Sequence, residues 1–146
     1  MQAIIFIGIQ GSGKSTVYKE HFFDTHLRIS MDLLNTRNKE QKLMEYARSV
    51  QQKVVIDNTN PTKSERKRYI DWFKEKKYEV VAYFFEPDLE RSLAWNSQRT
   101  GKQKVAEIGV KSVLKNLERP SKPEGFDRLY IITLNEKKQF EIVEKL

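Results

Sequence analysis

The sequence contains no cysteine and no long hydrophobic run. Without cysteine the chain can form neither disulfides nor thiolate metal sites, which fits a reducing compartment, and we expect a cytoplasmic protein. Without a stretch of about 18 consecutive apolar residues, no segment is expected to cross a membrane. Low-complexity tracts and linkers are also missing, so the 146 residues are expected to form one domain, residues 1–146.

Acidic residues are fewer than basic ones: the chain has 20 Asp and Glu and 27 Lys and Arg, which gives a net charge of +7. The resulting pI near 9.5 favours a polyanionic partner, although a protein can also be this basic without one. The N-terminus is not expected to be a signal peptide, because an apolar strand begins almost at Met1 and leads directly into a glycine-rich loop.

That loop is the most specific motif in the chain. Gly8, Gly13, Lys14 and Ser15 fill every fixed position of the phosphate-binding pattern G-x-x-x-x-G-K-[ST]. Backbone N–H groups of such a P-loop converge on phosphate, with the positive end of the next helix behind them. We expect Lys14 to reach the β- and γ-phosphates of a nucleoside triphosphate and Ser15 to bind Mg²⁺. The residues expected to hold the nucleotide here are Gly11, Ser12, Gly13, Lys14, Ser15 and Thr16.

Strand-like and helix-like segments alternate along the chain. The alternation predicts an α/β fold of the P-loop NTPase kind, a three-layer sandwich with a mainly parallel sheet. We expect strands at residues 2–8, 27–30, 53–57, 78–85 and 129–134, and helices at 16–21, 40–51, 60–76, 88–99 and 107–117. The helix near residue 60 has two candidate starts, an Asn60–Pro61 cap or a capping box at Thr62. Residues 140–143 fit either an added strand or a frayed helix.

Two carboxylates follow expected strands. Asp32 comes after the second strand and Asp57 ends the third, and the carboxyl ends of parallel strands are where ligands bind. Phosphoryl transfer needs a base for the acceptor hydroxyl and a ligand for the metal. Asp57 resembles a metal-binding carboxylate at the end of an apolar strand, which leaves Asp32 as the better general base. Alternatively, Asp32 caps a helix from Leu33 onward, and Asp57 forms a turn with Asn58 and Thr59.

Basic residues cluster in two places. Arg99, Lys102 and Lys104 lie in or near a glycine-containing break, and they form either a mobile lid over the triphosphate or a solvated cluster. The residues that open the helix after Asp57 either track a phosphate backbone or face solvent; they are Lys63, Arg66, Lys67 and Arg68. Trp72 and Trp95 are expected to be partly buried, with base stacking as the alternative.

Three segments resemble the 5′-hydroxyl polynucleotide kinase family. Residues 55–61, VIDNTNP, are similar to the I-D-N-T-N-P segment of those kinases, and residues 96–99, NSQR, with Lys102 are similar to their lid entry. Pro120 and residues 124–126, EGF, are similar to the ending of the mammalian-type kinase domain. The likeness runs from residue 3 to residue 134. No D-x-D-x-[TV] phosphatase motif is present, so the resemblance is to the kinase domain alone.

This resemblance implies transfer of the γ-phosphate of ATP to the 5′-OH end of DNA or RNA, with Mg²⁺, and a place in nucleic-acid repair. It implies Asp32 as the general base and Asp57 as a second essential carboxylate, with Asp57 and Ser15 at the metal. It also implies Arg99 as a lid arginine on the donor phosphates, within a helical lid over residues 96–117. The residues expected at the acceptor are Asp32, Asp57, Asn58 and Arg66. GTP remains open as an alternative donor.

The chain departs from the family at two positions. Met31 stands where the family usually has an arginine immediately before the aspartate, and Asn35 stands where the phage-type enzyme has an arginine that grips the substrate phosphate. Arg28 and Arg37 are candidates to replace them. Two other functions stay open: a P-loop kinase of a sugar, nucleoside or antibiotic, and a non-catalytic nucleotide-binding regulator. The regulator has less support, because no guanine-reading N-K-x-D segment is present.

Overall fold

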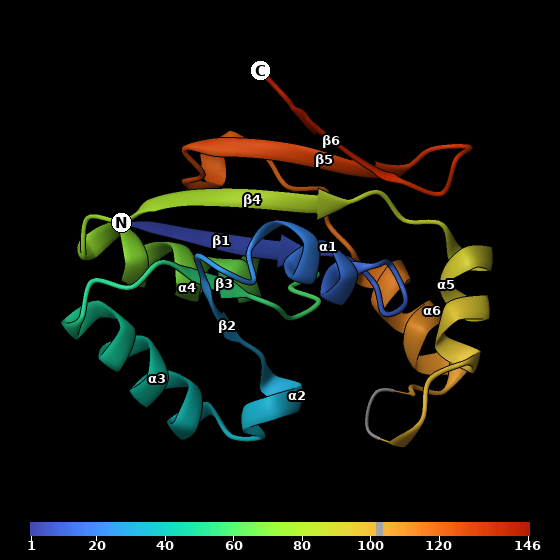
Figure 1. Ribbon diagram of the computed structural model, residues 1–146, viewed down its shortest axis with the longest axis horizontal. Helices are drawn as coiled ribbons and strands as arrows, with labels where there is room; N and C mark the ends of the chain where they lie inside the picture. Colours follow the sequence, from blue (N-terminus) through green and yellow to red (C-terminus); the bar gives the residue numbers. More distant parts are fainter. Residues whose placement is uncertain (102–103) are drawn as a thin grey trace.

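The computed structural model describes residues 1–101 and 104–146, and its centre is a six-stranded sheet in the order β2-β3-β1-β4-β5-β6 (Figure 1). The first five strands are parallel and β6 pairs antiparallel with β5. The mainly parallel sheet predicted from the alternation of segments is confirmed. The strands are β1 Gln2–Ile7, β2 Leu27–Ile29, β3 Val54–Ile56, β4 Glu79–Phe85, β5 Arg128–Leu134 and β6 Phe140–Glu144.

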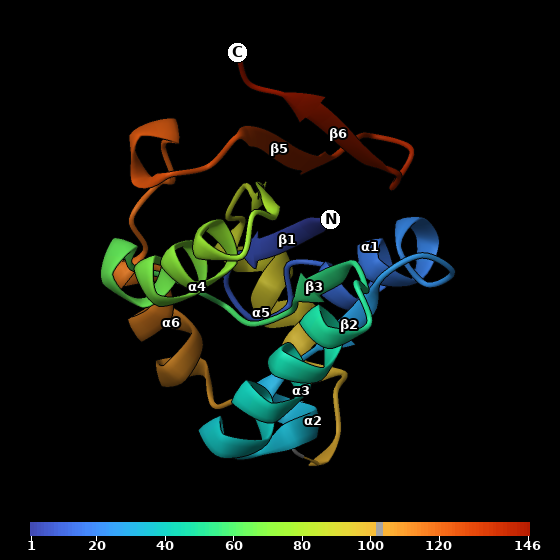
Figure 2. The same cartoon turned by 90° about the vertical axis from the view of Figure 1, so that its left-hand side faces the viewer.

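Helices cover both faces of this sheet. Figure 2 shows α1 on one side and α4 on the other, and Figure 1 places α5 and α6 beyond the ends of β1 and β4. None of the helices in the described ranges is long and apolar enough to cross a membrane. The helices are α1 Lys14–His21, α2 Met31–Leu34, α3 Arg37–Ser49, α4 Lys63–Glu75, α5 Leu89–Ser97, α6 Glu107–Asn116 and the short 3₁₀ helix η2 Lys122–Glu124.

The central strand β1 is apolar almost throughout because both of its faces are covered. Ile5 packs in a buried cluster with Met44 of α3 and Phe73 of α4. The next residue back, Ile4, points the other way and packs with Val17 of α1. Alternate side chains of one strand therefore hold the two helical layers to the sheet.

Capping side chains decide where two helices begin. The hydroxyl oxygen of Thr62 accepts a hydrogen bond from the N–H of Glu65 at 3.2 Å, so α4 starts from Thr62 and not from Asn60. Asn60 instead donates from Nδ2 to the carbonyl of Phe6 at 2.7 Å. Helix α3 begins three residues before the expected Glu40, because Thr36 caps it in the same way.

The structure decides one element that the sequence left open, in favour of the added strand, and contains a helix that was not predicted. Residues 140–143 belong to strand β6, which follows a turn where Asn135 Oδ1 accepts hydrogen bonds from the N–H groups of Lys137 and Gln139. The one-turn helix α2 was not expected, since Met31–Leu34 is too short to show a helical period.

His26 ties the start of β2 to β1. Its Nε2 lies 2.8 Å from Gln2 Oε1 and its Nδ1 lies 2.6 Å from the hydroxyl of Thr25. The side chain is buried, and this burial, with the charge of Lys53, lowers the pKa of His26 from 6.5 to about 4. The imidazole is therefore neutral in the folded protein at neutral pH.

We expect the free energy of unfolding to fall as the pH drops from 6.5 toward 4, because His26 binds a proton over this range in the unfolded chain but not in the folded protein. One pKa unit corresponds to about 1.4 kcal/mol, so the loss reaches about 2 kcal/mol by pH 4.5. A His26→Gln variant should lose less stability over this window by about that amount. Urea unfolding of both proteins at pH 7 and pH 4.5 measures the difference, and equal losses would remove His26 as the cause.

Candidate active site

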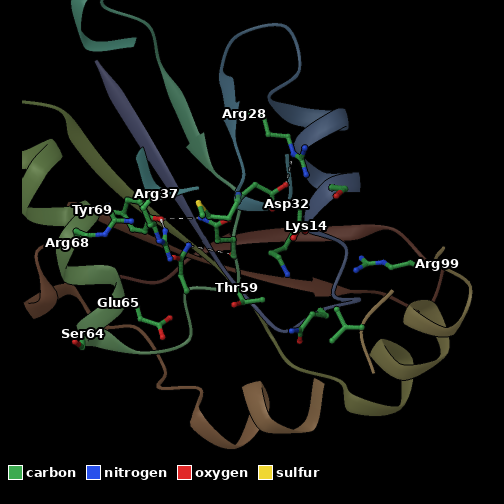
Figure 3. Close-up of a pocket in the computed structure, with 17 residues that line it drawn as sticks. Lys14, Arg28, Asp32, Arg37, Thr59, Ser64, Glu65, Arg68, Tyr69 and Arg99 are labelled. Atoms are coloured by element: carbon green, nitrogen blue, oxygen red, sulfur yellow. Dashed lines mark hydrogen bonds and ion pairs between the residues drawn. The ribbon is translucent and has the colours of Figure 1, made fainter. Parts of the chain in front are cut away.

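A cavity of about 430 Å³ opens beyond the carboxyl ends of β1, β2 and β3, where parallel sheets bind ligands (Figure 3). The P-loop, α2, the start of α4 and the segment after α5 contribute to its walls. Six of the residues predicted at the site line it together: Lys14, Ser15, Asp32, Asp57, Asn58 and Arg99.

The P-loop takes its shape from glycines that no other residue could replace. Gly11 and Gly13 have φ angles of 71° and 97°, in the left-handed region. A Cβ at Gly11 would collide with the carbonyl of Ser92 in α5, and one at Gly13 would collide with the ring of Phe140. Gly13 also caps α1 without a side-chain hydrogen bond, which leaves the first N–H groups of the helix for an anion.

Lys14 crosses the loop, and its ammonium donates to the carbonyls of Gly8 and Ile9 at 3.0 and 2.9 Å. Burial lowers the pKa of Lys14 from 10.5 to about 8; the charge of Arg99 lowers it further, while Asp57 and Asp32 raise it. A bound polyphosphate would add negative charge beside this ammonium and favour its protonated form.

Two other predicted nucleotide-binding residues, Ser12 and Thr16, do not line the cavity. Ser12 is buried, and its hydroxyl has no hydrogen-bond partner in the described part of the chain. Thr16 is exposed on α1. Gly11, Ser12 and Gly13 are therefore expected to contribute backbone N–H groups to a bound phosphate, as in a P-loop.

Asp32 is the second residue of α2 and is exposed at the cavity (Figure 3). Ser30 occupies the cap position of this helix, so the alternative in which Asp32 caps a helix is wrong. Asn58 Oδ1 accepts a hydrogen bond from the N–H of Met31 at 2.9 Å and thereby ties α2 to the end of β3. The predicted site residue Asn58 thus positions the segment that carries Asp32.

Asp57 is buried, and its Oδ2 accepts a hydrogen bond from Arg28 Nε at 2.7 Å. This ion pair, in place of the turn with Asn58 and Thr59, holds the carboxylate at the cavity. Arg28, one of two candidates to grip an acceptor, is engaged by Asp57.

Arg66 is the predicted site residue that the structure contradicts. It is fully buried, its Nε and Nη2 donate to Glu124 at 2.9 and 3.2 Å, and its Nη1 donates to the carbonyls of Asn60 and Pro61. These hydrogen bonds use four of the five N–H donors of the guanidinium, and Arg66 does not line the cavity. The residue therefore fixes the loop before α4, because its position on the helix turns it inward beside Tyr69.

We expect Arg66→Ala to lower the free energy of unfolding by about 3–5 kcal/mol, because it leaves the nearly buried carboxylate of Glu124 without its ion-pair partner. Lys67→Ala is the matched control, since the exposed Lys67–Asp71 pair should contribute about 0.5 kcal/mol or less. Denaturant unfolding measures both variants. A loss for Arg66→Ala no larger than that for Lys67→Ala would contradict the structural role.

The segment after α5 is closed by Asn96. Its Oδ1 accepts a hydrogen bond from the N–H of Val105 at 2.9 Å, and its Nδ2 donates one to the carbonyl of Val105. These two bonds hold Val105 next to the end of α5. Arg99 lies on this segment and lines the cavity. Lys102 lies outside the described residues, and Lys104 is exposed away from the cavity wall.

Neither tryptophan faces the cavity. Trp72 is half-buried against the core, with the Lys76 ammonium 4.3 Å from its ring centre. Trp95 packs near Phe140, at 6.3 Å between ring centres, and under the guanidinium of Arg91. The expected packing role describes both residues.

Arg37 and Arg68 were candidates from the sequence, but the residues that join them at the cavity, Glu40 and Tyr69, were not predicted there. Glu40 is fully buried and forms hydrogen bonds with Tyr69, Arg37 and Arg68. These three partners line the cavity, whereas Glu40 itself does not. The available signal was its position: Glu40 lies on the apolar face of α3 at the spacing of Leu43, Met44 and Ala47. A charged residue on such a face implies a buried partner.

Comparison with known families gives one match over most of the chain, the AAA domain, at residues 30–120. A bifunctional polynucleotide phosphatase/kinase of Schizosaccharomyces pombe is 27% identical over 144 residues, covering 96% of this chain and 35% of that protein. A protein of Acanthamoeba polyphaga mimivirus named for the same two activities is 33% identical over 139 residues, covering 90% and 33%. The chain thus spans about a third of the length of these curated relatives.

Solved structures share the fold at low sequence identity. Chaetomium thermophilum Kti12 in complex with ADP-AlF3 superposes with a TM-score of 0.68 at 16% identity, covering 93% of this chain and 92% of that one. Deoxyadenosine kinase of M. mycoides with bound dATP gives 0.53 at 18% identity, covering 95% of both chains. The sheet and its helices are those of P-loop kinases.

Proposed function

This chain belongs to the AAA domain family, and from that premise we propose that it is a polynucleotide 5′-hydroxyl kinase, which transfers the γ-phosphate of ATP to the 5′-OH end of DNA or RNA. The observation that carries the proposal is one cavity shared by the P-loop lysine Lys14 and the exposed carboxylate of Asp32. One end of that cavity can hold a phosphate donor and the other a hydroxyl acceptor. We assign residues 1–146 to a single kinase domain with a lid over residues 96–117.

On the donor side, the chain supplies positive charge. Backbone N–H groups of the P-loop and the ammonium of Lys14 bind the donor phosphates, and the guanidinium of Arg99 adds charge from the lid segment. Negative charge on the phosphoryl oxygens and on the leaving oxygen is stabilised where such donors are already oriented.

On the acceptor side, Asp32 acts as the general base. Its carboxylate accepts the proton of the hydroxyl as the hydroxyl oxygen bonds to the γ-phosphorus. The bond from that phosphorus to the bridging oxygen breaks, so ADP leaves with the electron pair and a 5′-phosphate ester is formed. The hydrogen bond from the N–H of Met31 to Asn58 keeps Asp32 at the cavity.

Ser15 and Asp57 would hold Mg²⁺. Both bring oxygen atoms to the cavity, the donor type that Mg²⁺ prefers. In the described part of the chain no three His, Asp or Glu side chains cluster into a metal cage. Mg²⁺ does not need one, because it keeps several waters and usually binds one or two protein groups besides the phosphates. Bound there, it neutralises charge on the β- and γ-phosphates.

Two observations support nucleic acid as the acceptor. The net charge of +7 favours a polyanion, and both curated relatives are named for polynucleotide kinase activity. A sugar or nucleoside kinase with the same P-loop has no need of this charge.

Incubation with γ-labelled ATP and Mg²⁺ tests the proposal. We expect label on DNA or RNA oligonucleotides that begin with a 5′-OH and none on the same oligonucleotides with a 5′-phosphate. Label confined to inorganic phosphate, or to sugars and nucleosides, would contradict it. Raising the salt concentration should weaken oligonucleotide binding more than ATP binding, and equal weakening would count against a surface that grips phosphates.

A further inference from the structure

A second cavity opens at the other end of the sheet, where β1 and β4 begin and where α3 and α4 end. Its volume is about 410 Å³, and the residues that line this far cavity include Arg48, Gln51, Lys76, Lys77 and Tyr78. Figure 1 shows α3 extending from α2 toward this end of the sheet, where the N-terminus also lies. Arg37, the first residue of α3, lines the cavity that holds Asp32, and Arg48, in the last turn, lines the far cavity. One helix of 13 residues, about 20 Å long, therefore connects the two cavities.

All the charged side chains that line the far cavity in the described part of the chain are positive. They belong to Arg48, Lys76 and Lys77. The ammonium of Lys76 is held in place, 4.3 Å from the ring centre of Trp72 and 4.0 Å from a carboxylate oxygen of Glu75, which does not itself line the cavity. Arg48 and Lys77 form no ion pair with any of the residues that the structure describes. Two positive charges at this cavity therefore have no carboxylate to balance them.

Both helices end at the far cavity in the same way. After α4, the N–H groups of Lys77 and Tyr78 donate back to carbonyls near the helix end, both at 3.0 Å. After α3, the N–H groups of Gln51 and Gln52 do the same at 3.1 and 2.8 Å. Each pair of bonds forms a Schellman motif, which needs one residue in the left-handed region. Gln51 and Lys77 are these residues, with φ angles of 55° and 63°.

Glycine is the usual residue at this position, because a side chain in the left-handed region costs free energy. Here both positions carry long polar side chains, and both residues line the far cavity. The hydroxyl of Tyr78 donates to the carbonyl of Gln52 at 3.3 Å and joins the two helix ends into one frame. The interaction of cations with the negative ends of helices explains positive charge here, but it does not require Lys77 to replace glycine. Strain of this kind is typical of ligand-binding positions.

We propose that the far cavity binds backbone phosphates of the acceptor nucleic acid, several nucleotides away from the 5′ end that lies at Asp32. This inference rests on the proposed function and adds a second contact to its substrate. Successive phosphates of one strand are about 3.4 Å apart along a helix, so a span of about 20 Å takes about six nucleotides. The protein therefore binds a long acceptor more tightly than a short one, and Arg48 and Lys77 supply the difference.

Two 5′-OH oligonucleotides of about 3 and about 15 nucleotides, bound without ATP, test this contact. With the wild-type protein we expect Kd to be at least about 10-fold lower for the longer strand. Its Kd should also depend more steeply on salt, because each phosphate contact on a single strand adds about 0.7 to the slope of log Kd against log salt concentration. Equal Kd values with equal slopes would overturn the far contact and leave the proposed function intact.

Lys77→Gly separates binding from stability. It removes the charge together with the strain at φ 63°, so Tm should rise by about 2–4 °C. Kd for the longer strand should nevertheless rise about 5-fold and its salt slope should fall by about 0.7, with binding of the shorter strand unchanged. Arg48→Gln should weaken binding of the longer strand in the same way.

Lys138→Gly is the matched control. Lys138 is an exposed lysine at φ 59° in the turn before β6, and it lines neither cavity. Its replacement removes the same charge and the same kind of strain, so it should raise Tm without changing the binding of either strand. If Lys77→Gly and Arg48→Gln bind the longer strand as Lys138→Gly does, the site is overturned and their charges serve only the helix ends.

Two further outcomes separate the ligand and the proposed function. If strand length makes no difference, and inorganic phosphate raises the Tm of the wild type more than that of Lys77→Gly, the far cavity takes a free phosphate and the nucleic-acid assignment fails. If no nucleic-acid hydroxyl is phosphorylated, but the longer strand binds more tightly and loses affinity in Lys77→Gly, the proposed function fails and the far site stands.

Discussion

Replacing Lys14 with alanine is expected to lower kcat/KM for phosphoryl transfer by about 10³-fold or more, the effect of removing a preorganised charge from the transition state. The ammonium of Lys14 donates to two P-loop carbonyls and lies under the influence of Asp57 and Asp32. Steady-state kinetics with a 5′-OH oligonucleotide measures the loss.

The fold should survive this substitution. Burying the Lys14 ammonium is unfavourable, as its lowered pKa shows, so alanine should leave Tm unchanged or raised in the nucleotide-free protein. The rise in Tm that ATP produces in the wild type should be lost, because ligand stabilises only what binds it. Lys42→Ala, exposed on α3, serves as the control for charge. Activity of Lys14→Ala within about tenfold of wild type would be incompatible with P-loop catalysis.

Replacing Asp32 is expected to lower kcat by about 10²–10⁴-fold, the usual contribution of a positioned general base. Asp32→Asn keeps the size of the side chain but cannot accept the hydroxyl proton, and Asp32→Ala removes the group altogether. Both variants should bind ATP as the wild type does, since Asp32 lies on α2 and not on the P-loop. Single-turnover kinetics, with ATP binding measured separately, tests this.

Substitutions of Asp32 and Asp57 should have different effects, because the two carboxylates have different roles. Asp57 is tied to Arg28 and buried, so its loss should disturb metal binding and the position of Arg28 together. Asp24→Ala, an exposed aspartate outside the cavity, is the matched control for Asp32→Ala. A near-wild-type rate for Asp32→Asn would remove the base assignment.

Much of the fold follows from local rules that the sequence displays. Apolar strands that alternate with amphipathic segments required a mainly parallel sheet, and the glycine pattern at Gly8 to Gly13 required a tight loop before a helix. Boundaries were less accurate where a cap decided them. Thr36 and Thr62 cap the N-termini of α3 and α4. Other polar residues nearby can cap a helix equally well, so the sequence alone does not show which of them is the cap.

In the candidate site, too, some features followed from the sequence and others only from the tertiary structure. The sequence by itself determined the phosphate-binding loop, with Lys14 and Ser15, and placed Asp32 and Asp57 at one edge of the sheet. These features depend on neighbours in the chain and on parallel strands ending together. Hydrophobic periodicity also marked the inward faces of α3 and α4, on which Glu40 and Arg66 lie.

Only the tertiary structure decided what those two charges do. Arg66 pairs with Glu124, 58 residues away, and Glu40 with Tyr69, 29 residues away. Periodicity reports which side of a helix is buried, but the partner that makes a buried charge tolerable comes from another element, whose approach depends on the packing of the whole sheet. For this reason the sequence could place Arg66 on the correct helix and still assign it to a substrate, while the tertiary structure turned it inward and brought Arg37 and Arg68 to the cavity.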